Sequence, residues 1–347
     1  MIKKFILLAL LVGSLTACSG GDKPVLKVYN WGAYIDESVI SDFEDEYGVR
    51  VIYDTYDSNE LMYTKLASGE KYDILVPTDH MVQRLIAEDK LQALDMDKIP
   101  NLENVDPGML NRPFDPNNVY SLPYFYGNIG IIYNKNNVDR ADLEAQGWSF
   151  LHDAEYADRV YVYDSARDVF MMAYKSLGYS INTTDEAQIE EAFQWLKTMN
   201  DVTRPTYLDE TLIDNMVNGE KDLAVTFSGD AAYVLSENPD MDFFVPAEGT
   251  NLWTDSMVIP VDAPNPDLAH KWINYMLDKT VAQKNTEYVG YTSPVKAAFD
   301  AVTASGGLYF GNPAYAPRLD NPLDEVHAYS PELVTILSDR WTRVKAD

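Results

Sequence analysis

Apolar residues in the first hundred positions alternate between short continuous runs, typical of strands, and spacings of three to four residues, typical of helices. The runs predict strands at 26–29, 49–53 and 72–76. Between them, Asp36 and Ser58 are expected to cap two helices that end at Gly48 and Gly69, and a third helix is predicted over 81–88. Strands separated by helices of this length indicate βαβ units and a parallel sheet.

A second α/β pattern follows the segment SLPYFYG at 121–127. It predicts strands at 129–133, 160–163, 222–227, 243–245 and 257–260. Helices are predicted at 167–177, around the apolar stripe from Ile189 to Leu196, and at 268–277 and 331–344. Two such patterns in a chain of 347 residues predict two lobes, because one core of this size is uncommon.

The N-terminus is typical of an export signal. Lys3 and Lys4 precede an apolar run that is too short to span a bilayer, and the string LTAC ends at Cys18. This string resembles the bacterial lipobox, so residues 1–17 are interpreted as a signal peptide, Cys18 as a lipidated residue, and 18–24 as a tether. The alternative is an ordinary signal peptide with an incidental cysteine. Cys18 is the only cysteine, which excludes a disulfide framework and a thiolate metal cluster.

The composition is strongly acidic. The formal charge of −28 becomes −30 when Lys3 and Lys4 leave with the signal peptide. Such a surface repels nucleic acid phosphates and attracts small cations, although acidic residues also serve solubility alone. Charge therefore argues against nucleic acid and gives only weak support for a cationic ligand.

Ligands of open parallel sheets bind beyond the carboxyl ends of the strands, so residues placed there are candidates for a site. The segments expected at this position are 31–34, 78–80, 165–168, 227–230 and 253–255. They are rich in aromatic residues and carboxylates, and they contain no Ser-His-Asp order, nucleotide glycine fingerprint or paired histidines. The pattern favours binding over catalysis, with no metal and no cofactor.

Several strings, taken in order, resemble the bacterial spermidine/putrescine-binding proteins, the substrate-capturing components of polyamine ABC importers. These strings are VYNWGAYI, VIYDTYDSNELMYTKL, YDILVP, FDPNNVYSLPYFYG, LGYSINTTD, LWTDSMVIP and VGYTSP, between Leu26 and Pro294. The resemblance implies a two-lobe type II periplasmic-binding-protein fold, α/β in class, each lobe a mixed, mostly parallel sheet flanked by helices, with ligand in the interlobe cleft. It implies chain crossings near Tyr133, Trp253 and 293–298. Lobe 1 would then comprise 25–132 plus 254–297, and lobe 2 would comprise 133–253 plus 298–347.

The chemistry of a polyamine can be stated independently. It is a methylene rod carrying ammonium groups, each of which needs a carboxylate when buried, and aromatic rings suit both parts. The resemblance implies that the following residues bind ligand: Trp31, Tyr34, Thr78, His80, Ser165, Asp168, Phe227, Asp230, Trp253, Asp255 and Tyr291. Asp255 would grip one ammonium and Asp168 another, while Trp31, Tyr34, Trp253 and Tyr291 would form aromatic walls.

The sequence departs from the spermidine-binding member of that family. That protein has an aspartate in place of Ser165, a glutamate in place of Asp168, a tryptophan in place of Phe227 and a tyrosine in place of His80. Asp230 is an additional acid that could compensate for the lost carboxylate. Glu325 and His327 lie near a C-terminal contact that cannot be aligned. These differences leave the choice between spermidine and putrescine open.

Simpler roles exist for several of these residues. Trp31 could pack a lobe, Asp168 could pair with Arg167, Asp230 could cap a helix, Phe227 could belong to a core and Asp255 could cap a turn.

At the level of function, the alternatives are the same fold with another small solute or cation, and an exported hydrolase that uses Asp168 and Asp255. The leading interpretation is a monomeric lipoprotein that is held at the outer face of the membrane by its lipid alone. It would deliver polyamine to the permease and ATPase of an importer, and it would not bind nucleic acid.

Overall fold

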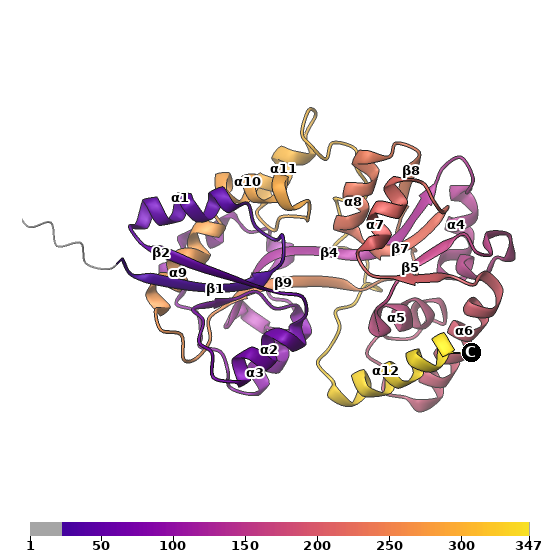
Figure 1. Ribbon diagram of the computed structural model, residues 1–347, viewed down its shortest axis with the longest axis horizontal. Helices are drawn as coiled ribbons and strands as arrows, with labels where there is room; N and C mark the ends of the chain where they lie inside the picture. The colour runs from indigo at the N-terminus through magenta and orange to yellow at the C-terminus, as the bar shows by residue number, and fades with distance from the viewer. Residues whose placement is uncertain (1–22, 347) are drawn as a thin grey trace, which may run out of the picture.

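The computed structural model describes residues 23–346, so the predicted signal peptide and Cys18 lie outside the described residues. Two lobes lie side by side, each a sheet covered by helices (Figure 1). In lobe 1 the strands are β1 (Val25–Trp31), β2 (Arg50–Tyr56) and β3 (Ile74–Leu75), and the helices are α1 (Glu37–Tyr47), α2 (Asn59–Ala67), α3 (Asp79–Ala87), α9 (Pro266–Met276) and α10 (Lys279–Val289). This two-lobe α/β architecture confirms the predicted fold class.

Lobe 2 repeats the plan. Its strands are β5 (Val160–Tyr163), β6 (Thr206–Leu208), β7 (Leu223–Phe227) and β8 (Met241–Phe244). Its helices are α4 (Arg140–Gln146), α5 (Ala166–Ser176), α6 (Glu186–Thr203), α7 (Thr211–Val217), α8 (Ser228–Glu237) and α12 (Pro331–Ala346). Short 3₁₀ helices complete the chain at η1 (Met96–Lys98), η2 (Pro100–Asn104), η3 (Pro107–Met109), η4 (Pro116–Asn118), η5 (Gly147–His152) and η6 (Ala154–Tyr156). Within residues 23–346, no helix is both long and apolar enough to cross a membrane.

Two long strands run from one lobe into the other, as Figure 1 shows: β4 (Ser121–Asn134) and β9 (Leu252–Val258). The first half of β4 pairs antiparallel with β9, and its second half pairs with β7 and β8. The strand order is β2-β1-β3-β9-β4-β7-β5-β6, with β8 on β4. Parallel pairs join β1 to β2 and β3, and β5 to β6 and β7, so the sheets are mixed as predicted.

The sequence pattern underestimated the length of both strands that cross between the lobes. A strand was expected only from Ile129, yet β4 begins at Ser121 and includes Pro123. The pairing shifts register between Pro123 and Phe125, and such an irregularity is where a strand tolerates a proline. The strand expected at 257–260 likewise begins at Leu252.

Local capping predictions hold in lobe 1. The Asp36 carboxylate accepts the Ser38 N–H at 2.8 Å, and the Ser58 hydroxyl accepts the Leu61 N–H at 3.2 Å. Helix α1 ends at Gly48, whose φ of 66° is the left-handed conformation that glycine adopts at low cost. These caps explain why the helix boundaries could be predicted from the sequence.

Each lobe has its own core. In lobe 1, Phe43 and Trp272 pack under the sheet, and in lobe 2, Trp148 and Phe170 do so. Helix α11 (Lys296–Thr303) lies at the boundary, since Ala298 belongs to the core of lobe 1 and Val302 to that of lobe 2. The exact lobe boundaries stay a prediction.

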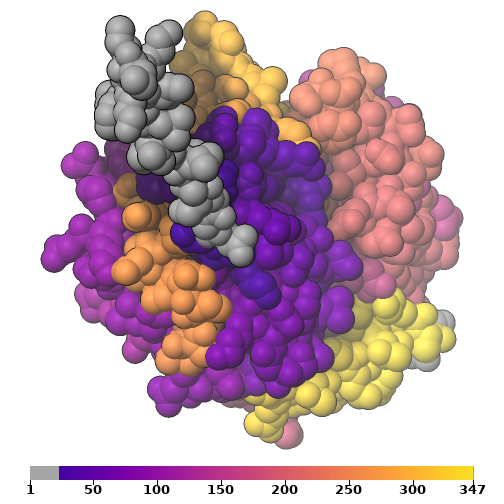
Figure 2. All heavy atoms as spheres, turned by 60° about the vertical axis from the view of Figure 1, so that its left-hand side comes forward, coloured from indigo at the N-terminus to yellow at the C-terminus, as the bar shows by residue number. Residues whose placement is uncertain are grey.

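Residues 316–330, here called the C-terminal strap, contact both lobes before α12 packs on lobe 2. On lobe 1, the Tyr329 N–H donates to Oε1 of Gln83 at 2.7 Å, and Figure 2 shows the yellow C-terminal segment beside the purple lobe. On lobe 2, the Asn182 side chain bonds the Val326 carbonyl at 2.9 Å and the Ala328 N–H at 2.8 Å. The strap therefore carries residues 325–327 into the region between the lobes.

An ion pair between a buried lysine and a partly exposed glutamate fixes this strap. Nζ of Lys175, which is only 3% exposed, donates to Oε1 of Glu325 at 2.7 Å. Oε2 of Glu325 accepts the Ser180 hydroxyl at 2.6 Å and the Ile181 N–H at 3.1 Å. A buried ammonium needs this partner, because an unpaired buried charge is costly.

We expect Glu325→Gln to lower the free energy of unfolding by about 2–3 kcal/mol, since it leaves the Lys175 ammonium buried without a carboxylate. Urea unfolding measures this loss. The double change Lys175→Met with Glu325→Leu should recover most of it, because no charge is then buried. Lys296→Met, which breaks the exposed pair with Asp300, is the control and should change stability by under about 0.5 kcal/mol. A loss for Glu325→Gln no larger than this control would contradict the prediction.

Candidate solute-binding site between the lobes

The predicted site residues come from both lobes and meet between them. Three helix starts converge there: Thr78 precedes α3, Ser165 precedes α5 and Phe227 precedes α8. Trp31 is the last residue of β1. One placement was wrong, because Trp253 and Asp255 lie inside β9 and not beyond its end. They reach the site because β9 itself runs between the lobes.

A row of aromatic rings forms one wall of the site. The ring of Tyr291 lies 5.5 Å from that of Tyr34 and 5.4 Å from that of Trp253, both edge to face. Phe227 continues the row at 6.1 Å from Trp253. Trp31 packs on Tyr56 at 4.7 Å, and its indole N–H donates to the Val76 carbonyl at 2.9 Å. Aromatic rings have flat apolar faces of the kind that methylene groups and ammonium ions both favour.

Two glycines make room for this wall. A Cβ on Gly229 would lie 2.3 Å from the Tyr291 ring, and one on Gly127 would lie 2.4 Å from the Trp253 ring. Neither glycine was singled out in the sequence. The sequence offered two signals for them: Gly229 lies close to Phe227, and Gly127 lies inside the string SLPYFYG.

Asp255 is the carboxylate at one end of the wall. It is 7% exposed, its Oδ2 accepts the Tyr34 hydroxyl at 2.8 Å, and its backbone bridges to Thr78. Burial raises the pKa of Asp255 to about 7, with hydrogen bonds from Tyr34 and Thr78 opposing the shift and the charge of Asp79 adding to it. The alternative role of capping a turn is wrong, because Asp255 sits mid-strand.

Asp230 is the second carboxylate. Its Oδ1 accepts the Tyr291 hydroxyl at 2.6 Å and its Oδ2 accepts the Thr226 hydroxyl at 3.0 Å. Burial raises the pKa of Asp230 to about 6, against the effect of these two hydrogen bonds. The suggested N-cap role is wrong, since Phe227 is the N-cap of α8 and the Asp230 side chain turns to Tyr291 instead. Within the described part of the chain, neither Asp230 nor Asp255 forms an ion pair with a basic residue.

Asp168 has a different environment. Its Oδ1 lies 3.6 Å from Nε2 of His327, which the C-terminal strap supplies. Burial acts to raise the pKa of Asp168, but His327, the Ser165 hydroxyl and the charge of Arg167 outweigh it, so the pKa is lowered. The basic side chain in contact with Asp168 is therefore that of His327, whereas the sequence had suggested Arg167. His327 was noted only as a neighbour of an unaligned contact, because 159 residues separate it from Asp168 in the chain.

His80 lies deeper at the lobe 1 side. It is 7% exposed, and burial together with the charges of Arg167 and His327 holds its pKa well below the usual value, so it is neutral. Its neighbour Asp79, 1% exposed, accepts the Thr254 N–H at 3.1 Å and the His80 N–H at 2.6 Å. Burial raises the pKa of Asp79 to about 6. Asp79 ties the start of α3 to β9 and was not identified from the sequence.

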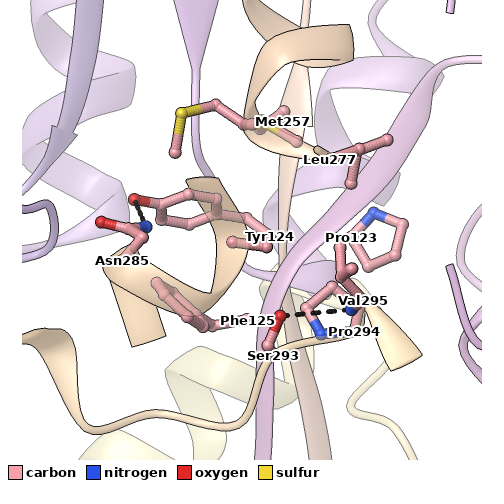
Figure 3. Close-up of a pocket in the computed structure, with 11 residues that line it drawn as sticks. Pro123, Tyr124, Phe125, Met257, Leu277, Asn285, Ser293, Pro294 and Val295 are labelled. Carbon is pink, nitrogen blue, oxygen red and sulfur yellow. Dashed lines mark hydrogen bonds between the residues drawn. The ribbon is translucent and has the colours of Figure 1, made fainter. Parts of the chain in front are cut away.

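A small crevice lies behind the aromatic wall, inside lobe 1 (Figure 3). Tyr124 and Phe125 of β4 line it with Ser293 and Asn285, and the Asn285 amide donates to the Tyr124 hydroxyl at 2.8 Å. None of the described residues that line this crevice carries a carboxylate. It serves to seat Tyr124 and Phe125, whose rings lie 5.6 Å and 5.2 Å from Tyr34 and so support the wall.

The chain matches the family described as bacterial extracellular solute-binding protein over residues 38–308. It belongs to this family. The spermidine/putrescine-binding periplasmic protein of Salmonella typhimurium is 37% identical over 286 residues, which cover 82% of this chain and 81% of that protein. The putrescine/cadaverine-binding protein of Pseudomonas aeruginosa is 32% identical and covers 99% of both chains.

Among solved structures, the spermidine/putrescine ABC transporter substrate-binding protein PotD from Streptococcus pneumoniae superposes with a TM-score of 0.83 at 36% identity, covering 93% of this chain and 99% of that one. These matches confirm the resemblance that the ordered sequence strings indicated. The family and the fold are those of extracytoplasmic substrate-binding proteins and not of enzymes, which removes the hydrolase alternative.

The raised pKa of Asp255 has a consequence for stability. Its ordinary value is 3.8 and its folded value about 7, so between these values the folded state holds a proton that the unfolded state lacks. Stability attributable to this group is therefore present at low pH and is lost as pH rises toward 7.

We expect Asp255→Asn to stabilise the ligand-free protein by about 1–3 kcal/mol at about pH 8 and by progressively less toward about pH 4. Urea unfolding at several pH values measures this difference. Asp339→Asn, which changes an exposed acid on α12, should be neutral at every pH. An Asp255→Asn protein less stable than the original chain at pH 8 would contradict the assignment of a buried, uncompensated carboxylate.

Proposed function

We propose that this chain captures polyamines outside the cytoplasm and delivers them to an ABC importer. The observation that carries the proposal is the pair Asp255, which is buried, and Asp230, which is partly buried; neither carboxylate faces a basic residue in the part of the chain that the structure describes. Uncompensated buried charge disfavours the ligand-free state, and a ligand with ammonium groups would relieve it. Relatives named for spermidine, putrescine and cadaverine support the same ligand class.

The binding roles of the individual residues belong to this proposal. Asp255 and Asp230 would each hold an ammonium group, while Tyr34, Tyr291 and Trp253 would cover the methylene chain. Trp31, Thr78, His80, Ser165, Asp168 and Phe227 would complete the site. Tyr34 and Tyr291 already donate to the two acids, so a bound ammonium would add to these hydrogen bonds and need not replace them.

Hinge closure is the proposed mechanism. The Tyr291 hydroxyl, from a residue packed on the core of lobe 1, donates to Asp230 on α8 of lobe 2, so closing the lobes assembles the site. A ligand that contacts both acids at once favours the closed arrangement by its differential affinity for it.

We also propose that Cys18 carries lipid and holds a monomer at the outer face of the membrane, with 19–24 as the tether. The LTAC string and the preceding apolar run support this proposal. The permease and ATPase of the importer would be its protein partners, and the membrane contact would be made by the lipid alone.

Titration of the purified protein with putrescine and spermidine, followed by tryptophan fluorescence, tests the function directly, because Trp253 lies in the wall. We expect a saturable change. Competition experiments, in which excess polyamine is added against a bound amino acid or metal ion, distinguish a polyamine-binding protein from a protein of the same fold that binds another solute. No saturable change with any polyamine would contradict the proposal.

Asp255→Ala should lower polyamine affinity about 100-fold or more, because it removes the partner of a buried ammonium. Ser165→Ala should lower affinity far less, since the hydroxyl assists Asp168 and carries no charge. Calorimetry measures both. Equal, small effects of the two changes would contradict the assignment of Asp255 as the principal anchor.

Affinity should also depend on pH. Only the ionised carboxylates attract ammonium, and the pKa values of Asp255 and Asp230 without ligand are about 7 and about 6. Binding should therefore weaken as pH falls from about 8 to about 5, and it should release protons near neutrality. Calorimetry in two buffers of different ionisation enthalpy measures the protons released. An affinity that does not change over this range would be inconsistent with binding to these two groups.

A further inference from the structure

We infer that the site selects a diammonium ligand over a triammonium one, because the protein balances the charge of its remaining acids with its own arginines and a histidine. This inference rests on the proposed function and deepens it. The acids between the lobes fall into two groups that differ in their basic neighbours. Asp255 and Asp230 form the open group, and Asp79 and Asp168 form the balanced group.

The open group has hydrogen-bond donors but no cation. The partners of Asp255 are the side chains of Tyr34 and Thr78, and those of Asp230 are the hydroxyls of Tyr291 and Thr226. Glu210 is exposed, and although its charge contributes to the raised pKa of Asp230, solvent screens it, so it does not provide a buried partner for an ammonium group. The uncompensated charge is therefore that of two carboxylates, which matches two ammonium groups.

The balanced group is surrounded by basic side chains. His327, 7% exposed, lies 3.6 Å from Asp168. The charge of Arg167 acts on both Asp79 and Asp168, and Arg112 lies within electrostatic reach of Asp79. Two acids and two arginines leave no net negative charge here for a third ammonium.

Arg167 is placed to repel such a group. It precedes Asp168 in the first turn of α5 and is only partly exposed. Among residues 23–346 its guanidinium makes no hydrogen bond or ion pair within 4.0 Å, so no acid holds it in a single direct pair. A third ammonium near Asp168 would meet the guanidinium charge of Arg167, while the His327 side chain already lies against the Asp168 carboxylate. Like charges brought together in this way discriminate strongly against a ligand.

The test compares three ligands by calorimetry: putrescine, spermidine and N1-acetylspermidine. The acetylated ligand nearly keeps the length of spermidine but carries two ammonium groups. We expect putrescine to bind at least about tenfold more tightly than spermidine, and acetylation to restore much of the difference. A spermidine affinity equal to or above that of putrescine would overturn the inference. It would also be overturned if N1-acetylspermidine bound as weakly as spermidine, because ligand length and not ligand charge would then determine the selectivity.

Two variants test which residues are responsible for the selectivity for putrescine over spermidine. Arg167→Gln and His327→Gln should each narrow the ratio of putrescine to spermidine affinity several-fold, chiefly by strengthening spermidine binding. Arg50→Gln, an exposed arginine on β2, is the matched control and should leave the ratio unchanged. An unchanged ratio in both site variants would overturn the inference while leaving polyamine binding intact. Absence of binding by all three ligands would instead overturn the proposed function, and this inference with it.

Discussion

A carboxylate that is withdrawn from water without a cation raises the free energy of the folded protein, and this chain holds two between its lobes, one buried and one partly buried. Asp255 and Asp230 are kept there by tyrosine hydroxyls, which satisfy one oxygen of each but supply no opposite charge. Much of the surrounding structure serves this arrangement. Gly127 and Gly229 admit the aromatic rings, and Tyr124 supports the Tyr34 backbone through a bond of 2.6 Å to its carbonyl. The instability stored at these acids is what a cationic ligand can relieve.

The two crossing strands explain how one site can draw on both lobes. Because β9 passes between the lobes while fully buried, Asp255 and Trp253 occupy a rigid position that either lobe can approach. The Tyr291 ring packs on Trp253 of this strand, and the Tyr291 hydroxyl donates to Asp230 on α8, a hydrogen bond that joins the lobes. The C-terminal strap adds a second connection through Gln83 and Tyr329. Affinity and domain movement therefore depend on the same contacts.

Charge balance separates residues that look equivalent in the sequence. Asp168, Asp230 and Asp255 are all acids in segments that end between the lobes, yet the pKa of the first is lowered and those of the other two are raised. The difference comes from His327 and Arg167, which compensate Asp168 within the protein. An acid that the protein already neutralises is a poorer partner for a ligand. In the selectivity that we propose, such internal compensation would make the site discriminate between ligands by charge with its aromatic walls unchanged.

Local features and family membership could be predicted from the amino-acid sequence alone. Caps such as Asp36 and Ser58, the periodicity of the helices, and the ordered aromatic and acidic strings depend on neighbours within a few residues, so they predicted two α/β lobes and the set of candidate residues. How those residues are used depends on packing between segments that lie far apart in the chain. Whether an acid is compensated depends on side chains from remote segments: His327 reaches Asp168 across 159 residues, and Tyr34 reaches Asp255 across 221. The full length of β4 and β9 was likewise hidden, because strands buried on both faces and interrupted by Pro123 lack an alternating pattern. Local pattern therefore predicts which residues can form a site, and long-range packing sets the charge that the site presents to its ligand.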